Sequence, residues 1–138
     1  MVVGPIAFVG VGSAGEVPAS GLGGVKGEDR GLKVLAVVDE GVEVTVSVAP
    51  RDLGHAALLY DPAAFRQDGL YALSDGDREV TFQSCAKGEN PYGRKGPTQF
   101  NGGFVVDGPR CVTLEVASSE SLKQASISFG AGHCSASS

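Results

Sequence analysis

Three cysteines carry the most distinctive chemistry of this chain: Cys85, Cys111 and Cys134. They form no C-x-x-C motif and the chain has 2 histidines, so a structural zinc site is not expected. A disulfide would use two of the cysteines, leave one thiol over and indicate an oxidising compartment. We favour Cys111–Cys134, with Cys85–Cys111 as the main alternative. Other pairings and reduced thiols stay open, because spacing alone does not determine connectivity.

The favoured pairing rests on strand register. If Ser118 pairs with Gln124 in an antiparallel hairpin, Cys111 lies opposite about residue 131. Cys134 is a few residues farther on, and the glycines before it allow the chain to bend back.

Three carboxylates stand at alternate positions, Asp75, Asp77 and Glu79. Calcium prefers several hard oxygen ligands in one loop, so these residues are a weak calcium candidate. The D-x-D-x-D-G pattern is absent, and a solvated turn before a strand is the main interpretation. We expect no other metal site and no cofactor.

An enzyme is not expected, because acid–base candidates are scarce. No G-x-S-x-G elbow occurs, and His133 is adjacent to Cys134, where neighbouring strand residues point to opposite faces. The competing hypothesis is a hydrolytic enzyme whose site combines Asp75 and Asp77 with His55 or His133. A concave pocket that joins a histidine to a carboxylate would favour it.

The segment 10–15 matches the dinucleotide fingerprint G-x-G-x-x-G. That motif needs a helix directly after it, with its N-terminus at the pyrophosphate. Pro18 and further glycines follow instead, which disfavours a helix. We interpret this stretch as a flexible, glycine-rich segment.

Period-2 alternation identifies the strands. Residues 42–48 put four valines on one face, and residues 111–117 and 125–129 alternate in the same way. Residues 33–38 precede the valine strand across a short turn, which predicts a hairpin. The chain is expected to form an antiparallel, Ig-like (Greek-key) β-sandwich of about seven to nine strands, with little helix.

Three segments are expected along the chain. Residues 1–31 form a glycine-rich lead-in with a possible edge strand, residues 32–134 form the sandwich domain, and residues 135–138 form a tail. The longest polar loop of the second half lies within the sandwich and contains Tyr92, Arg94 and Lys95. These side chains suit recognition, so the loop is the candidate binding loop.

Four strings carry a resemblance to a known group: LLYDP, ALSDGDREVTFQSC, TQFNGGFVVDGPRCVTLEV and SFGAGHC. Together they span roughly residues 33 to 134. The chain resembles a family of small secreted or lipid-anchored actinobacterial proteins without a known activity. The resemblance implies export and the three-cysteine pattern, and it supplies no catalytic residue.

Charge and hydropathy limit the partners. The net charge is −5 and no basic stripe offsets it, so a nucleic-acid partner is not expected. No apolar run is long enough for a transmembrane helix, and the first residues lack the basic region of a signal peptide. The protein is therefore expected to be secreted or anchored to the outer face of the membrane, with its signal peptide absent from this sequence.

The sequence predicts a non-enzymatic binding or structural module with an unknown protein or envelope partner. Self-assembly is the other alternative, because an exposed apolar edge strand at Val34 to Val38 would allow strand addition and a homo-oligomer.

Overall fold

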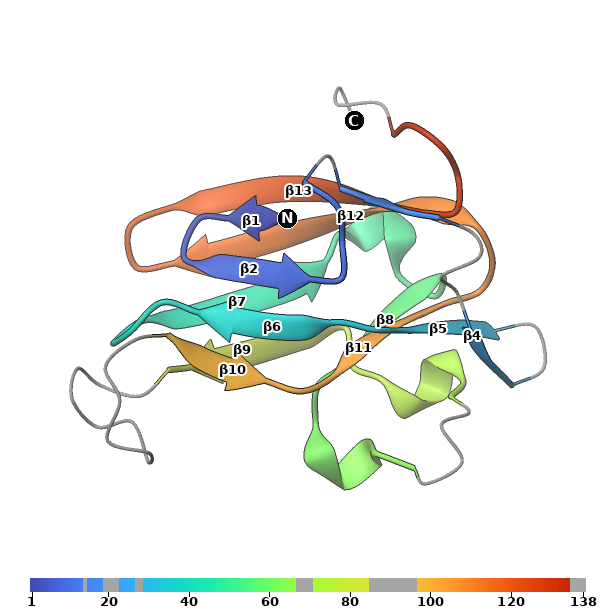
Figure 1. Cartoon of the computed structure of the whole chain (residues 1–138), viewed down its shortest axis with the longest axis horizontal. Coiled ribbons are helices and arrows are strands. Elements are labelled where there is room, and N and C mark those ends of the chain that lie inside the picture. The colour runs from blue at the N-terminus through green and yellow to red at the C-terminus, as the bar shows by residue number, and fades with distance from the viewer. Residues whose placement is uncertain (14, 19–22, 27–28, 67–70, 85–96, 135–138) are drawn as a thin grey trace.

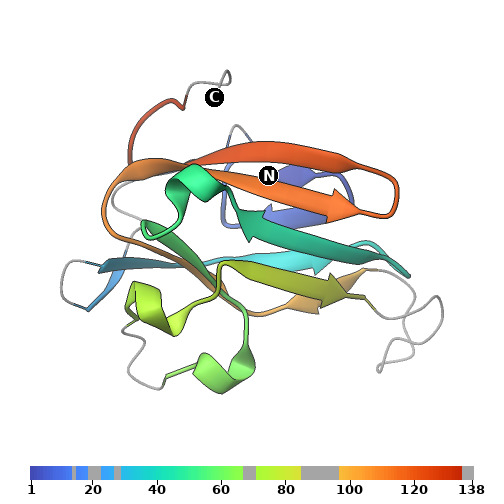
Figure 2. The same ribbon diagram turned by 180° about the vertical axis from the view of Figure 1, so that it is seen from behind.

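The fold is an immunoglobulin-like β-sandwich whose two layers appear from opposite sides in Figures 1 and 2. The computed structural model describes residues 1–13, 15–18, 23–26, 29–66, 71–84 and 97–134. The all-β antiparallel sandwich expected from the sequence is confirmed, with one parallel strand pair added.

The back layer is a single sheet of order β3-β13-β12-β7-β9. Its strands are β3 (Glu16–Val17), β7 (Glu43–Val48), β9 (Glu79–Gln83), β12 (Arg110–Ser118) and β13 (Leu122–Phe129). Every neighbouring pair is antiparallel except β3 and β13.

The front layer consists of two sheets, β1-β2-β6-β10 and β4-β5-β11-β8. Their strands are β1 (Val2–Val3), β2 (Ile6–Val9), β4 (Gly23–Lys26), β5 (Asp29–Lys33), β6 (Leu35–Val38), β8 (Ala56–Leu59), β10 (Thr98–Phe100) and β11 (Gly103–Val106). Three short 3-10 turns complete the described elements: η2 (Pro50–Asp52), η3 (Pro62–Ala64) and η4 (Leu73–Asp75). Asp61 caps η3, because its side chain accepts a hydrogen bond from the Ala63 amide. An aspartate followed by proline is a typical sequence pattern for the start of such a turn.

Two long strands pass from one front sheet into the other. One is β5 followed by β6, which is interrupted at Val34, and the other is β10 followed by β11, which is interrupted at Asn101 and Gly102. Asn101 and the glycines after it predict such a bend, because glycine inside a strand pattern marks a bulge or bend. The two interruptions face each other, because the Val34 amide donates to the Gly102 carbonyl at 2.9 Å. The strand order is that of an immunoglobulin-like domain, with β2, β6 and β10 on one layer and β7, β12 and β13 on the other.

Tyr60 closes this junction from inside the core. Its hydroxyl donates to the Val34 carbonyl at 2.9 Å. Desolvation by burial raises the pKa of Tyr60, so the hydroxyl stays protonated and acts as a donor. A Cβ on Gly102 would overlap the Tyr60 ring, so only glycine allows the ring to lie there.

Aromatic rings fill the centre of the sandwich. Phe104 contacts Phe8, Tyr60 and Phe129, with ring centroids 5.7, 6.2 and 5.5 Å away. Phe82 continues the cluster at 5.0 Å from the Tyr60 ring. These rings come from both layers and join the sheets by apolar burial.

The hairpin expected between residues 33–38 and 42–48 is wrong. β6 pairs with β2 and β10, whereas β7 pairs with β12 and β9 in the opposite layer. Alternation shows which face of a strand is buried but does not identify the neighbouring strand. The same pairing makes β6 an interior strand, so the edge expected at Val34 to Val38 is wrong as well.

The interpretation of residues 1–31 as a lead-in needs correction. Ile6 and Phe8 are almost fully buried, at 1% and 0% exposure, and Val11 and Val17 also belong to the core. Glycines interrupt the apolar residues in this part of the sequence, so the alternation that identifies a strand is too short there to predict β1, β2 and β3. The expected edge strand exists, because β1 ends its sheet.

The Tyr60 hydroxyl predicts a measurable stability loss. We expect Tyr60→Phe to lower the free energy of unfolding by about 1–3 kcal/mol, because the buried Val34 carbonyl loses its donor. Chemical denaturation of the variant and the parent protein measures this difference in the free energy of unfolding. The matched control is Tyr71→Phe, whose hydroxyl is solvent-exposed and should cost about 0.5 kcal/mol or less. Equal losses in both variants would contradict a special role for Tyr60.

Candidate functional site

The disulfide joins Cys111 to Cys134, with Cα atoms 5.8 Å apart. The favoured pairing is therefore confirmed, although the register used for it is wrong. Cys111 lies opposite Ser128, not residue 131, because Ser118 already bonds to Ser121 across a tight hairpin loop. The chain then turns back through glycines with positive φ, as expected.

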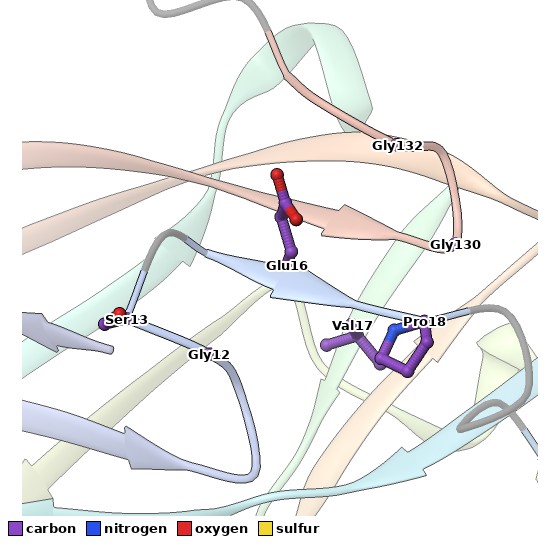
Figure 3. A pocket seen from close by; sticks show the side chains of 7 residues that line it. All are labelled: Gly12, Ser13, Glu16, Val17, Pro18, Gly130 and Gly132. Atoms are coloured by element: carbon purple, nitrogen blue, oxygen red, sulfur yellow. The ribbon is translucent and has the colours of Figure 1, made fainter.

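A small pocket of about 430 Å³ lies beside the disulfide end of β13 (Figure 3). Its lining residues are Gly12, Ser13, Glu16, Val17, Pro18, Gly130 and Gly132. Backbone bonds hold it, since Gly12 donates to the Glu16 carbonyl at 3.1 Å and Gly130 donates to the Val17 carbonyl at 2.8 Å. The glycine motif at 10–15 thus leads into strand β3, and no helix follows it in the described residues.

Glu16, which lines this pocket, has a histidine close to its carboxylate. His133 Nδ1 lies 3.6 Å from Glu16 Oε1, and both side chains are exposed. Figure 3 shows the Glu16 carboxylate pointing away from Ser13, the hydroxyl of the pocket. Nucleophilic catalysis needs the nucleophile and its base within hydrogen-bond reach, and this arrangement does not provide that contact.

The other histidine belongs to a charge network at the same end of the sandwich. His55 Nδ1 lies 2.6 Å from Asp107 Oδ2, and Arg110 donates to the other oxygen of Asp107 at 3.3 Å. Arg110 also lies 3.8 Å from Asp52, whose second oxygen accepts from the Thr113 amide at 2.8 Å. This network ties η2 and the start of β8 to the β11–β12 turn. Its carboxylates are all engaged, which is typical of a structural role, although the buried Arg110 Nε finds no hydrogen-bond partner among the described residues.

Asp107 titrates abnormally in this network. Desolvation by itself would raise the pKa of Asp107, but the hydrogen bonds and positive charges of His55 and Arg110 together lower it below its usual 3.8. The folded state therefore favours the ionised carboxylate.

The weak calcium candidate is not assembled. The two oxygens of Asp75 are used by Arg66 at 2.7 Å and by the Ala72 amide at 2.8 Å. Asp77 pairs through its backbone with Leu58 in β8, and Glu79 lies exposed in β9. Among the described residues no three histidine, cysteine or acidic side chains cluster as metal ligands do. Alternation in the sequence did not bring these carboxylates together, because Asp75 caps its own turn.

Several predicted residues lie outside the described part of the chain: Cys85 and the binding-loop candidates Tyr92, Arg94 and Lys95. The strands on either side of that loop are described. Gln83 at the end of β9 pairs with Glu43, and Thr98 at the start of β10 pairs with Val38. Both strands therefore meet the loop at the end of the sandwich where β6 leads into β7.

At that end the structure holds a larger groove, of about 840 Å³. It lies between the β6–β7 turn, the β12–β13 hairpin and the β1–β2 turn, which Figure 1 shows at the left of the molecule. Its lining residues are Gly4, Pro5, Asp39, Gly41, Val42, Glu43, Thr45, Ala117, Ser118, Ser119, Glu120, Ser121 and Lys123. Sequence reasoning missed this groove, because it joins turns from opposite layers, and one of them was predicted as a hairpin. We call it the end groove.

No protein-family model matches the chain, and no curated protein shows significant similarity to it. The likeness to the actinobacterial family therefore stays a prediction. A search of the described residues for a long apolar helix able to cross a membrane finds none.

The lowered pKa of Asp107 predicts a pH dependence of stability. A carboxyl with a lowered folded pKa stabilises the protein above its unfolded pKa of about 3.9, and this contribution disappears as pH falls through the folded value. Asp107→Asn should therefore cost most at neutral pH, about 1 kcal/mol or less because water screens this half-exposed pair. The cost should shrink below pH 4.

Denaturation of both proteins between pH 2 and pH 7 measures this dependence. Glu79→Gln, at an exposed position outside the network, is the control and should show no such convergence. A constant difference between Asp107→Asn and the parent protein at every pH would contradict the assignment.

Proposed function

We propose that this protein is an extracellular, non-enzymatic recognition domain that binds a partner through the end groove. The observation that carries the proposal is the groove itself, about 840 Å³ in volume and formed by turns from both layers. Loops at one end of an immunoglobulin-like sandwich are a common place for binding, because the sheets hold them in fixed positions. Pockets of this size are typical of ligand sites.

The turns around the groove are held by hydrogen bonds. Asp39 donates its amide to the Pro5 carbonyl at 2.9 Å, which ties the β6–β7 turn to the β1–β2 turn. The buried Ser84 hydroxyl donates to the Val42 carbonyl at 2.9 Å and accepts from the Val42 amide at 2.8 Å. Preorganised walls reduce the entropy lost on binding, which supports recognition over a purely structural role.

A catalytic role has less support. His55 is engaged by Asp107, His133 faces only Glu16 in the ion pairs of the described residues, and neither histidine contacts a hydroxyl nucleophile there. Self-assembly through β6 also loses its basis, since β6 is an interior strand.

The extracellular location rests on the disulfide. Disulfides persist in oxidising compartments and are rare in the cytosol. The Cys111–Cys134 bridge is compatible with secretion or with anchoring to the outer face of the cell membrane.

The location is tested by intact mass after alkylation without reductant, on protein recovered from native culture medium or cell envelope. The chain has 3 cysteines, so we expect one alkylated thiol and a mass deficit of two hydrogens. Reduction before alkylation is the control and should give three modified thiols. Three modified thiols without reductant would contradict an extracellular life.

The binding role is tested by photo-crosslinking in the native cells. A photoreactive residue replaces exposed Ser119 at the rim of the groove, and a second variant carries it at exposed Leu53, at the far end of the sandwich. We expect a discrete crosslinked adduct from position 119 and none from position 53. Absence of an adduct at 119, or the same adducts at both positions, would contradict the proposal.

A further inference from the structure

We propose, on the basis of the proposed function, that the end groove receives a basic segment of a partner protein, one that presents lysine or arginine side chains. The charges of its lining carry the proposal. Among the described residues, the groove is lined by three carboxylates, Asp39, Glu43 and Glu120, and by one cation, Lys123. The lining is therefore acidic, in a chain whose net charge is −5.

These three carboxylates come from different elements. Asp39 lies in the β6–β7 turn, Glu43 begins β7 and Glu120 lies in the β12–β13 hairpin loop. No ion pair of Asp39, Glu43 or Glu120 is found within the described part of the chain, whereas Asp52, Asp75 and Asp107 are all paired with arginines. Within the described residues, no cation therefore competes with an incoming one for these carboxylates.

Hydroxyl groups supplement the carboxylates. Thr45, Ser118, Ser119 and Ser121 line the same space. Their oxygens accept hydrogen bonds, which suits ammonium and guanidinium groups that have only donors. Several of these hydroxyls are held in place, since Thr45 bonds to Thr81 at 2.9 Å and Ser118 to Ser121 at 3.4 Å.

The lining also indicates which partners do not fit. None of the described residues that line the groove is aromatic, so they do not form the stacking platform used for proline-rich segments. Anionic partners, including nucleic acid and phosphorylated peptides, would be repelled by the carboxylates. A volume of about 840 Å³ is far larger than a metal ion requires and accommodates a few residues of an extended chain.

The test measures binding of a labelled octapeptide of alternating lysine and serine by fluorescence anisotropy, at low and at physiological salt. The groove variant combines Asp39→Asn, Glu43→Gln and Glu120→Gln. We expect it to raise the Kd about tenfold, because it removes three exposed pairs that each contribute a fraction of a kcal/mol. We also expect binding by the parent protein to weaken as salt increases. An octapeptide of alternating glutamate and serine should not bind.

The matched control removes the same charge elsewhere. Glu16→Gln, Glu79→Gln and Glu115→Gln neutralise three strand carboxylates of the back sheet that do not line the groove. This control should change the Kd less than about threefold, since long-range charge alone is screened. Equal weakening in both triple variants, or no binding of the lysine peptide by the parent protein, would overturn the proposal.

Two readouts separate this inference from the proposed function. If the peptide test fails while the adduct at position 119 persists, the groove binds a partner that is not basic. If both fail, the groove is not a binding site. Circular dichroism of each triple variant verifies folding, and a variant that does not fold is replaced by its three single substitutions.

Discussion

The hydrogen bonds that meet at Val34 hold the two bent strands of the front layer together. Val34 receives the Tyr60 hydroxyl at its carbonyl and gives its own amide to Gly102, so the interruptions of both strands are satisfied inside the core. An unpaired backbone group at this depth would cost about 1–3 kcal/mol. Because the bends are fixed, β6 and β10 turn toward one end of the sandwich, and β5 and β11 toward the other. The aromatic cluster around Phe104 then packs against this junction.

The two ends of the sandwich consequently differ in how their turns are linked and in whether their charged side chains are paired. One end is closed, because the Cys111–Cys134 bridge and the ion pairs of Asp107 and Arg110 hold its turns. The other end is open, because the turns there meet around the end groove and leave carboxylates without ion pairs among the described residues. This difference in charge between two ends that are both held by hydrogen bonds agrees with the proposed recognition role, because binding residues often lie on loops that a rigid scaffold positions.

Some of this was predictable from sequence, and physical reasons explain the rest. Strands β7, β12 and β13 follow from alternating valine, leucine and isoleucine, and so does the sandwich class. Alternation does not identify the neighbouring strand, so β6 and β7 were predicted as a hairpin although they lie in opposite layers. The disulfide was predicted with the correct cysteines and a register shifted by three residues, because the loop after Ser118 is shorter than assumed. The end groove depends on that long-range arrangement and has no signal in the sequence.

The disulfide also determines how the domain carries mechanical load. Cys134 lies beyond β13, and its bond to Cys111 encloses the whole β12–β13 hairpin in a covalent loop. Tension applied to the residues after Cys134 passes through the sulfur atoms to Cys111, and from there back along the chain into the β11–β12 turn. Residues 112–133 lie inside the covalent loop, so this tension bypasses them and does not pull β13 away from its neighbours β3 and β12. A pull on the C-terminal side therefore cannot extend the β12–β13 hairpin while the disulfide is intact, and the load falls on β11 and on the strands β5 and β8 that pair with it.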